Sequence, residues 1–121
     1  MVQNNNNNNL EIYQRYSEII YYTYNLLRKY PKSENFALVQ EIKSNMLSGL
    51  KNLMYAVKSY KSIDKLKYLN EFDITLSLFK FYIRLSYNYK YISMQNYKTW
   101  SNMLTNICNM LGGWINSCHK K

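Results

Sequence analysis

The chain contains few residues that interrupt a helix: three glycines and a single proline, Pro31, in 121 residues. No stretch alternates strictly between apolar and polar residues, as a half-buried strand does. An apolar run of about 20 residues is also missing, because Lys80 and Arg84 interrupt the most apolar window, so no membrane span is predicted. These absences favour an all-α protein, and the length indicates one domain.

Side chains suited to catalysis or metal binding are scarce. The one histidine, His119, follows Cys118 near the end of the chain, and a zinc site needs more ligands than this pair. No glycine-rich loop is followed by the Lys and Ser or Thr of a phosphate-binding motif. Cys108 and Cys118 lie about 15 Å apart along one expected helix and cannot form a disulfide with each other. We therefore expect a protein that is not an enzyme and that holds no metal or cofactor.

Negative charge is absent from the last part of the chain, since no acidic residue follows Asp73. Overall, 16 Lys and Arg oppose 7 Asp and Glu, which gives a formal net charge of +9. A chain this small then attracts polyanions over much of its surface. The abundance of Asn, Lys, Tyr and Ile is also typical of an AT-rich genome, which weakens charge as evidence of function. With no charged-then-apolar leader, a cytoplasmic location is expected.

Apolar residues recur at steps of three and four residues in four segments, which predicts four amphipathic helices. The predicted boundaries are Leu10 and Tyr30 for the first helix, an N-cap at Ser33 and an end near Ser59 for the second, and N-caps at Ser62 and Ser93 for the third and fourth. Connections this short favour an antiparallel, up-down-up-down four-helix bundle. We expect residues 1–9, which include the asparagine run, to be disordered, residues 10–118 to form the bundle and residues 119–121 to form a basic tail.

One face of each helix is expected to point into the core. The inward residues are Tyr13, Tyr16, Ile20, Thr23 or Tyr24, Leu27 and Tyr30 in the first helix, and Val39, Ile42, Met46, Gly49 or Leu50, Leu53, Val57 and Tyr60 in the second. They are Leu69, Phe72, Leu76, Phe79 and Ile83 in the third helix, and Tyr97, Trp100, Leu104, Ile107, Leu111, Trp114 and Cys118 in the fourth.

The third helix carries a second apolar stripe on its opposite face, made of Ile74, Leu78, Phe81 and Leu85. A four-helix bundle buries only one stripe of a helix. The second stripe is therefore either broad apolar coverage that reaches neighbouring helices or a contact surface for a subunit or partner.

A glycine pair, Gly112 and Gly113, interrupts the apolar seam of the fourth helix. Each glycine costs about 1 kcal/mol relative to Ala in a helix interior. The pair therefore indicates either the close approach of a neighbouring helix or subunit, or a kink.

Basic residues gather at one end of such a bundle, where the second helix ends, the third begins and the fourth ends. This end collects Lys58, Lys61, Lys65, Lys67, Lys120 and Lys121. Lys80 and Arg84 form a side patch, one turn apart on the third helix. Solvated surface charge is one interpretation, and contact with nucleic-acid phosphates is the other.

Three segments, in order along the chain, resemble the accessory variability determinant proteins of diversity-generating retroelements. They are Lys29–Phe36, Leu78–Leu85 and Met110–Ile115, the last with a Leu-Gly-Gly-Trp-Ile motif. Those proteins belong to a wider four-helix-bundle family that includes proteins encoded in 23S rRNA intervening sequences. The resemblance spans about residues 10–118.

The resemblance implies a basic, non-catalytic protein that assembles as a homopentameric ring or barrel of bundles. It implies two partners, the retroelement reverse transcriptase and the template-repeat RNA, with DNA as a further nucleic acid, in mutagenic cDNA synthesis. It also implies that Lys80 and Arg84 bind RNA or the polymerase. An intervening-sequence-type bundle that acts as an oligomeric RNA-binding or protein-interaction scaffold is the alternative.

Overall fold

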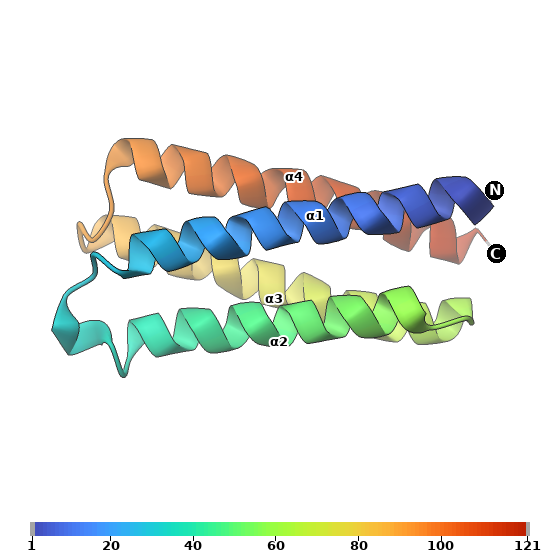
Figure 1. Cartoon of the computed structure of the whole chain (residues 1–121), viewed down its shortest axis with the longest axis horizontal. Helices are drawn as coiled ribbons and strands as arrows, with labels where there is room; N and C mark the ends of the chain where they lie inside the picture. The colour runs from blue at the N-terminus through green and yellow to red at the C-terminus, as the bar shows by residue number, and fades with distance from the viewer. Residues whose placement is uncertain (1, 121) are drawn as a thin grey trace.

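The computed structural model of the chain describes residues 2–120, and the side chains of residues 9–120. Four α-helices run alternately up and down: α1 (Val2–Leu27), α2 (Leu38–Lys58), α3 (Ser62–Asn88) and α4 (Met94–His119) (Figure 1). A short 3₁₀ helix, η1 (Lys32–Glu34), lies between α1 and α2. The described residues contain no strand, and the predicted all-α four-helix bundle is confirmed.

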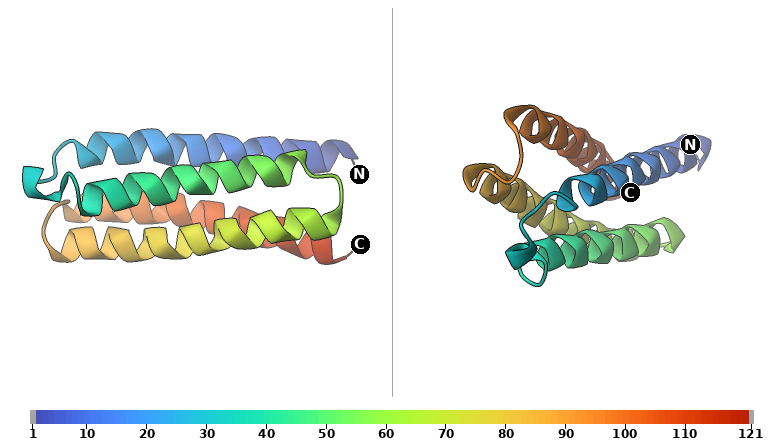
Figure 2. Two further views of the ribbon diagram at one scale, coloured as in Figure 1. Left: turned by 90° about the horizontal axis from the view of Figure 1, so that it is seen from below. Right: turned by 60° about the vertical axis from the view of Figure 1, so that its left-hand side comes forward.

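Helices that follow one another in the chain are neighbours in space, and α4 returns to pack against α1 (Figure 2). The tightest pair is α2 with α3, and the loosest is α1 with α2. As a result, the start of α1, the α2–α3 connection and the end of α4 all lie at one end of the bundle. The α1–α2 and α3–α4 connections lie at the other (Figure 1).

The helix starts agree only partly with the predicted caps. Ser93 is the N-cap of α4, and its hydroxyl accepts a hydrogen bond of 3.0 Å from the Asn96 amide. Ser33 is wrong as a cap, because it lies inside η1 and α2 begins at Leu38 after an Ala37 N-cap. Pro31 precedes this 3₁₀ turn as its N-cap, with φ −56° and ψ 143°. Ser62 is also wrong as a cap, because it lies within the first turn of α3.

The start of α1 differs from the sequence prediction. The helix begins at Val2, so the backbone of the asparagine run is helical here, where we expected disorder. Extending an existing helix adds a hydrogen bond per residue without a new nucleation cost, and Asn costs less than about 1 kcal/mol relative to Ala. A division of the chain at residue 10 stays a prediction.

The core confirms the predicted faces of α3 and α4 almost residue by residue. All five predicted residues of α3 are buried, and so are Trp100, Leu104, Ile107, Leu111 and Cys118 of α4. The buried indole of Trp100 donates a hydrogen bond of 2.9 Å to the hydroxyl of Thr23 on α1. This bond satisfies both polar groups and ties the fourth helix to the first.

The predicted face of α1 is confirmed at Tyr16, Thr23, Leu27 and Tyr30, which are buried, and is wrong at Tyr13. Ile12 and Ile19 are buried, whereas Tyr13 and Tyr24 are exposed. Ile12 and Ile19, which the prediction left out, complete this buried face, and Thr23 is the correct alternative to Tyr24.

The last part of the predicted α2 face is also wrong. Ala56 is buried in place of Val57, which is exposed, and Tyr60 lies beyond the last helical residue and is 99% exposed. The helical repeat therefore does not apply to Tyr60.

Candidate nucleic-acid interface

The predicted basic end exists as a structural unit (defined here as Lys58, Lys61, Lys65, Lys67 and Lys120). Lys58 is the last residue of α2, Lys61 is the N-cap of α3, and Lys120 is the C-cap of α4. These three helix termini meet at one end of the bundle (Figure 1). Asp64, in the first turn of α3, adds one negative charge there. The remaining predicted member, Lys121, lies outside the described residues.

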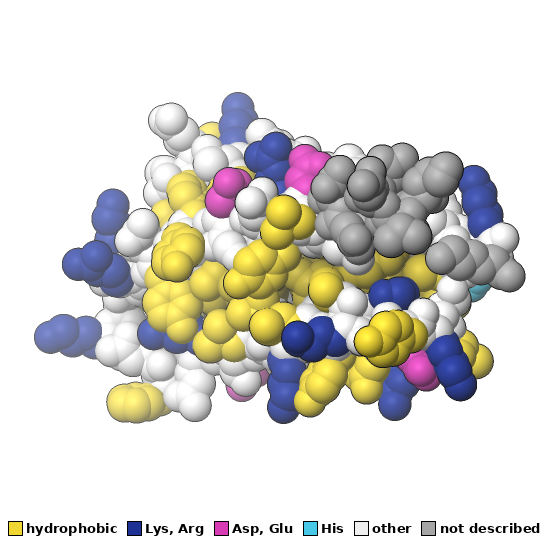
Figure 3. All heavy atoms as spheres, turned by 45° about the vertical axis from the view of Figure 1, so that its right-hand side comes forward, with side chains coloured by type: hydrophobic (Ala, Val, Ile, Leu, Met, Phe, Trp, Pro, Cys, Tyr) yellow, Lys and Arg dark blue, Asp and Glu magenta, His cyan; other side chains and the backbone are white. Residues whose placement is uncertain are grey.

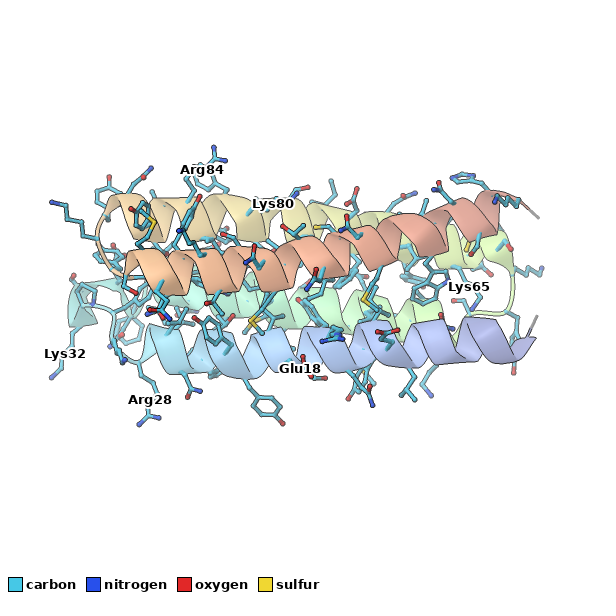
Figure 4. All side chains as sticks on the ribbon, turned by 90° about the horizontal axis from the view of Figure 1, so that it is seen from above. Glu18, Arg28, Lys32, Lys65, Lys80 and Arg84 are labelled. Carbon is cyan, nitrogen blue, oxygen red and sulfur yellow. The ribbon has the colours of Figure 1, made fainter. Side chains whose placement is uncertain are left out.

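Lys65 also has a role in the fold. It is half-buried, and its Nζ donates a hydrogen bond of 3.1 Å to the carbonyl of Ala56 in the last turn of α2 (Figure 4). The last carbonyls of a helix have no partner within the helix and carry the negative end of its dipole. The Lys65 ammonium group therefore caps α2 while adding positive charge to the basic end.

Aromatic side chains at the basic end were missed as part of the candidate site. Tyr60 lies in the connection between α2 and α3, beside Lys61, and is almost fully exposed. Tyr55 of α2 stacks on Tyr68 of α3, with ring centroids 5.0 Å apart and an angle of 23° between the planes. Lys67 lies over the Tyr68 ring at 5.5 Å. The sequence signal was available, since Tyr60 directly precedes Lys61, but the helical repeat had assigned this tyrosine to the core.

Lys80 and Arg84 of α3 are both exposed, and Arg84 extends away from the bundle (Figure 4). Neither belongs to an ion pair among residues 9–120. Lys80 is near Cys108 on α4. Burial raises the pKa of that thiol, while the charge of Lys80 lowers it and that of Asp73 raises it. The predicted side patch is thus solvent-accessible and lies beside α4.

A second group of basic residues occupies the opposite end and was not among the predicted site residues. Its members are Arg28, Lys29 and Lys32 near the α1–α2 connection and Lys90 in the α3–α4 turn. Figure 4 shows Arg28 and Lys32 extending outward at the end opposite Lys65. The same topological reasoning that located the first end applies here, because both connections meet at this end.

Glu34 is the acidic group tied into this second end. One carboxylate oxygen accepts a hydrogen bond of 2.6 Å from the Tyr91 hydroxyl, which raises the pKa of that tyrosine. The other oxygen accepts a hydrogen bond of 3.3 Å from the Leu38 amide at the start of α2. Glu34 therefore stabilises the N-terminus of α2 from its position in η1, because a negative charge is favourable at the positive end of the helix dipole.

The surface carries exposed apolar side chains as well as charge. On the face drawn in Figure 3, hydrophobic side chains gather along the middle, and Lys and Arg side chains lie at the edges and also among the hydrophobic ones. The second stripe of α3 adds to the exposed apolar surface. Ile74 and Phe81 are each 59% exposed and Leu78 is also exposed, whereas Leu85 is half-buried against the core.

The glycine pair of α4 does not serve close packing within the chain. Among the atoms that the structure describes, a Cβ on Gly112 or Gly113 would meet none within 4 Å, and α4 continues through both residues. The close approach occurs at Gly49 instead, where a Cβ would lie 2.5 Å from Thr75 Cγ2. The sequence offered the close approach of a neighbouring helix of this chain as one explanation of Gly112 and Gly113. Among the described residues, no helix approaches them closely, and this explanation is wrong.

The described residues contain no group of three or more His, Cys, Asp or Glu side chains arranged to hold a metal ion. Among them, no helix combines the length and apolar character needed to cross a membrane. The described surface has exposed Lys and Arg side chains at both ends of the bundle and on α3. At the basic end, aromatic rings lie among the lysines.

Fold and surface together define a small basic four-helix-bundle protein. A bAvd-like family model matches residues 10–118, and the chain belongs to this family. The match covers the three segments on which the resemblance to accessory variability determinants rested.

A solved structure from Bacteroides thetaiotaomicron, described as a protein of unknown function from the S23 ribosomal protein family, has the same fold. Its TM-score is 0.81 at 18% sequence identity, over 90% of this chain and 98% of the other. No curated protein sequence matched the chain.

Proposed function

We propose that this chain is a non-catalytic accessory protein of a diversity-generating retroelement, which binds the reverse transcriptase and the template RNA in support of mutagenic cDNA synthesis. The observation that carries the proposal is the bAvd-like match over residues 10–118. The exposed cations supply a physical route to RNA, because Lys and Arg gain affinity for phosphates by releasing counterions. In this proposal Lys58, Lys61, Lys65, Lys67, Lys80, Arg84, Lys120 and Lys121 contact RNA or the polymerase.

The proposed active form is a ring of several copies, five by resemblance. Ile74, Leu78 and Phe81 leave apolar surface uncovered on the single chain, and Leu85 extends the stripe toward the core. Gly112 and Gly113 leave open space on α4 that the backbone of another copy is able to approach. A ring multiplies the charge of +9 per subunit into one strongly cationic surface.

An RNA-binding or protein-interaction scaffold of the intervening-sequence type is the second candidate. The observation in its favour is the similarity in fold to the S23-family protein. Co-purification separates the two candidates: the primary proposal requires a stable complex with the reverse transcriptase encoded beside this gene, and the scaffold does not. A gene neighbourhood without a reverse transcriptase and paired repeats would contradict the primary proposal.

RNA binding is tested by fluorescence anisotropy over a range of salt concentrations. We expect affinity to fall steeply with salt, and Lys80→Gln with Arg84→Gln to weaken binding to RNA or to the polymerase. The matched control is Arg15→Gln with Lys43→Gln, which removes the same net charge. Arg15 already lies 3.8 Å from both Glu11 and Glu18, so its charge is partly offset. Equal losses in the two double variants would mean that only net charge matters.

A further inference from the structure

The basic end exposes aromatic surface that contributes little to the fold. Tyr60 is 99% exposed in a connection of three residues, with Lys58 two residues before it and Lys61 directly after it. A ring in this position gains almost nothing from burial within the chain. Its position, fixed between two helix ends and beside two ammonium groups, is that of a ring available to a ligand.

A second aromatic element lies nearby on the α2–α3 pair. Tyr55 and Tyr68 are stacked with their centroids 5.0 Å apart, and Tyr55 is still 47% exposed. The Nζ of Lys67 lies 5.5 Å from the centroid of the Tyr68 ring. At this distance the electron-rich face of the ring attracts the ammonium group. Because the two rings come from different helices and hold each other in place, this aromatic surface is organised before any ligand binds.

Exposed rings among ammonium groups match the chemistry of single-stranded nucleic acid. Unpaired bases stack on aromatic side chains, while Lys and Arg follow the phosphates, and this binding is tolerant of sequence. Bases in a duplex are stacked on each other and do not offer their faces to a protein ring, so a duplex gains only the phosphate contacts.

We propose that the basic end binds single-stranded RNA, with an unpaired base stacked on Tyr60 and the flanking phosphates held by Lys58, Lys61 and Lys67. The Tyr55–Tyr68 pair extends the stacking surface along α2 and α3. This inference rests on the proposed function for RNA as the ligand and adds the strand form and the place of binding. Asp64 offsets part of the positive charge of these lysines. Because lysines contact the phosphates of single strands and duplexes alike, the rings supply the preference for single strands.

The test compares a fluorescein-labelled, unstructured single-stranded RNA of about 12 nucleotides with the same strand annealed to its complement. Anisotropy titrations at several salt concentrations give Kd for each. The unaltered chain is expected to bind the single strand about tenfold more tightly than the duplex. Ultraviolet cross-linking of the bound single strand, mapped by mass spectrometry, is expected to modify Tyr60.

Variants separate stacking from charge. Tyr60→Ala is expected to lose about tenfold in affinity for the single strand and to leave the salt dependence unchanged, whereas Tyr60→Phe keeps the ring and the affinity. Lys61→Gln is expected to reduce the slope of log Kd against log salt by about 0.7. Tyr21→Ala is the matched control, since Tyr21 is 74% exposed on α1. Its substitution is expected to change nothing.

The outcomes distinguish the two proposals. If the chain binds single strand and duplex equally and Tyr60→Ala has no effect, the stacking site is overturned while the proposed RNA function stands. If the chain binds neither form even at low salt, RNA binding itself fails, and the stacking site fails with it. Because the Tyr60 side chain is in solvent, Tyr60→Ala is expected to fold, and a circular dichroism melt checks this.

Discussion

The hydroxyl of Tyr16 lies 2.8 Å from the point that a Cβ on Gly49 would occupy, and it donates a hydrogen bond of 2.6 Å to the carbonyl of Met46. Thr75 of α3 approaches the same point from the other side, at 2.5 Å. Side chains from α1 and α3 therefore both reach the backbone of α2 at one level, in space that only glycine leaves free.

Gly49→Ala is expected to destabilise the bundle by about 1–3 kcal/mol, because the added methyl group overpacks this contact. The gain in helix propensity, about 1 kcal/mol, does not offset the clash. Urea denaturation followed by circular dichroism measures the effect. Gly112→Ala is the matched control and is expected to stabilise the single chain by up to about 1 kcal/mol, since its Cβ meets open space. Equal stability of the two variants would contradict the close contact at Gly49.

Thr23→Val is expected to cost about 1–3 kcal/mol, although the two side chains have nearly the same shape. The change removes the hydroxyl that accepts the hydrogen bond from Trp100, and it leaves a buried N–H without a partner. Thr23→Ser keeps the hydroxyl and is the control, with a smaller loss expected from the missing methyl group. If Thr23→Ser is the more damaging of the two, packing and not the hydrogen bond holds α4 to α1.

The bundle itself follows from periodicity, since apolar repeats of three and four residues persist through α3 and α4 and are buried as predicted. The face of α1 is predicted only in part, because Ile12 and Tyr13 are adjacent in the chain, as are Thr23 and Tyr24, and only packing selects which of each pair is buried. The role of a glycine is harder still. The space around Gly49 is set by Tyr16 and Thr75, which lie far away in sequence, whereas a Cβ on Gly112 or Gly113 would meet no described atom within 4 Å.

The candidate site shows the same division between topology and local geometry. The basic end follows from helix order alone, because antiparallel helices place the α2–α3 connection, with Lys58 and Lys61, at the same end as the terminus of α4. The opposite end, with Arg28 and Lys90, follows from the same rule, because the α1–α2 and α3–α4 connections lie together there. The exposure of Tyr60 was not predictable from periodicity, since it depends on where α2 stops.

The stability of the bundle is expected to fall as the pH rises above about 10. Burial raises the pKa of Tyr30 from 10.0 to about 12 and also raises that of Tyr16. Tyrosines of the unfolded chain release protons near pH 10, whereas these two keep theirs in the folded chain, so the unfolded state binds fewer protons. Their contribution is complete below about pH 10 and is lost as the pH rises through the folded pKa, near 12 for Tyr30.

Urea denaturation at about pH 8 and about pH 11 measures this loss. Tyr16→Phe is expected to be less stable at neutral pH by about 1 kcal/mol, because its hydrogen bond to Met46 is lost, but to be less sensitive to alkali. Tyr21→Phe, at an exposed position, is expected to follow the unaltered chain. The explanation fails if Tyr16→Phe shows the same loss between the two pH values as the unaltered chain does.

Ile74→Ser combined with Phe81→Ser is expected to lower the mass of the assembly without destabilising the single chain. Both side chains are 59% exposed, so a further gain from burying them has to come from another molecule. Leu85 is left unchanged because it packs against the core, and replacing it would confuse folding with assembly. Multi-angle light scattering at low and high salt gives the mass, and urea denaturation gives the stability. Tyr21→Ser removes a comparable exposed apolar group from α1 and is expected to leave the mass unchanged. A mass that is the same for the double variant and the unaltered chain would mean that the α3 stripe is not a subunit interface.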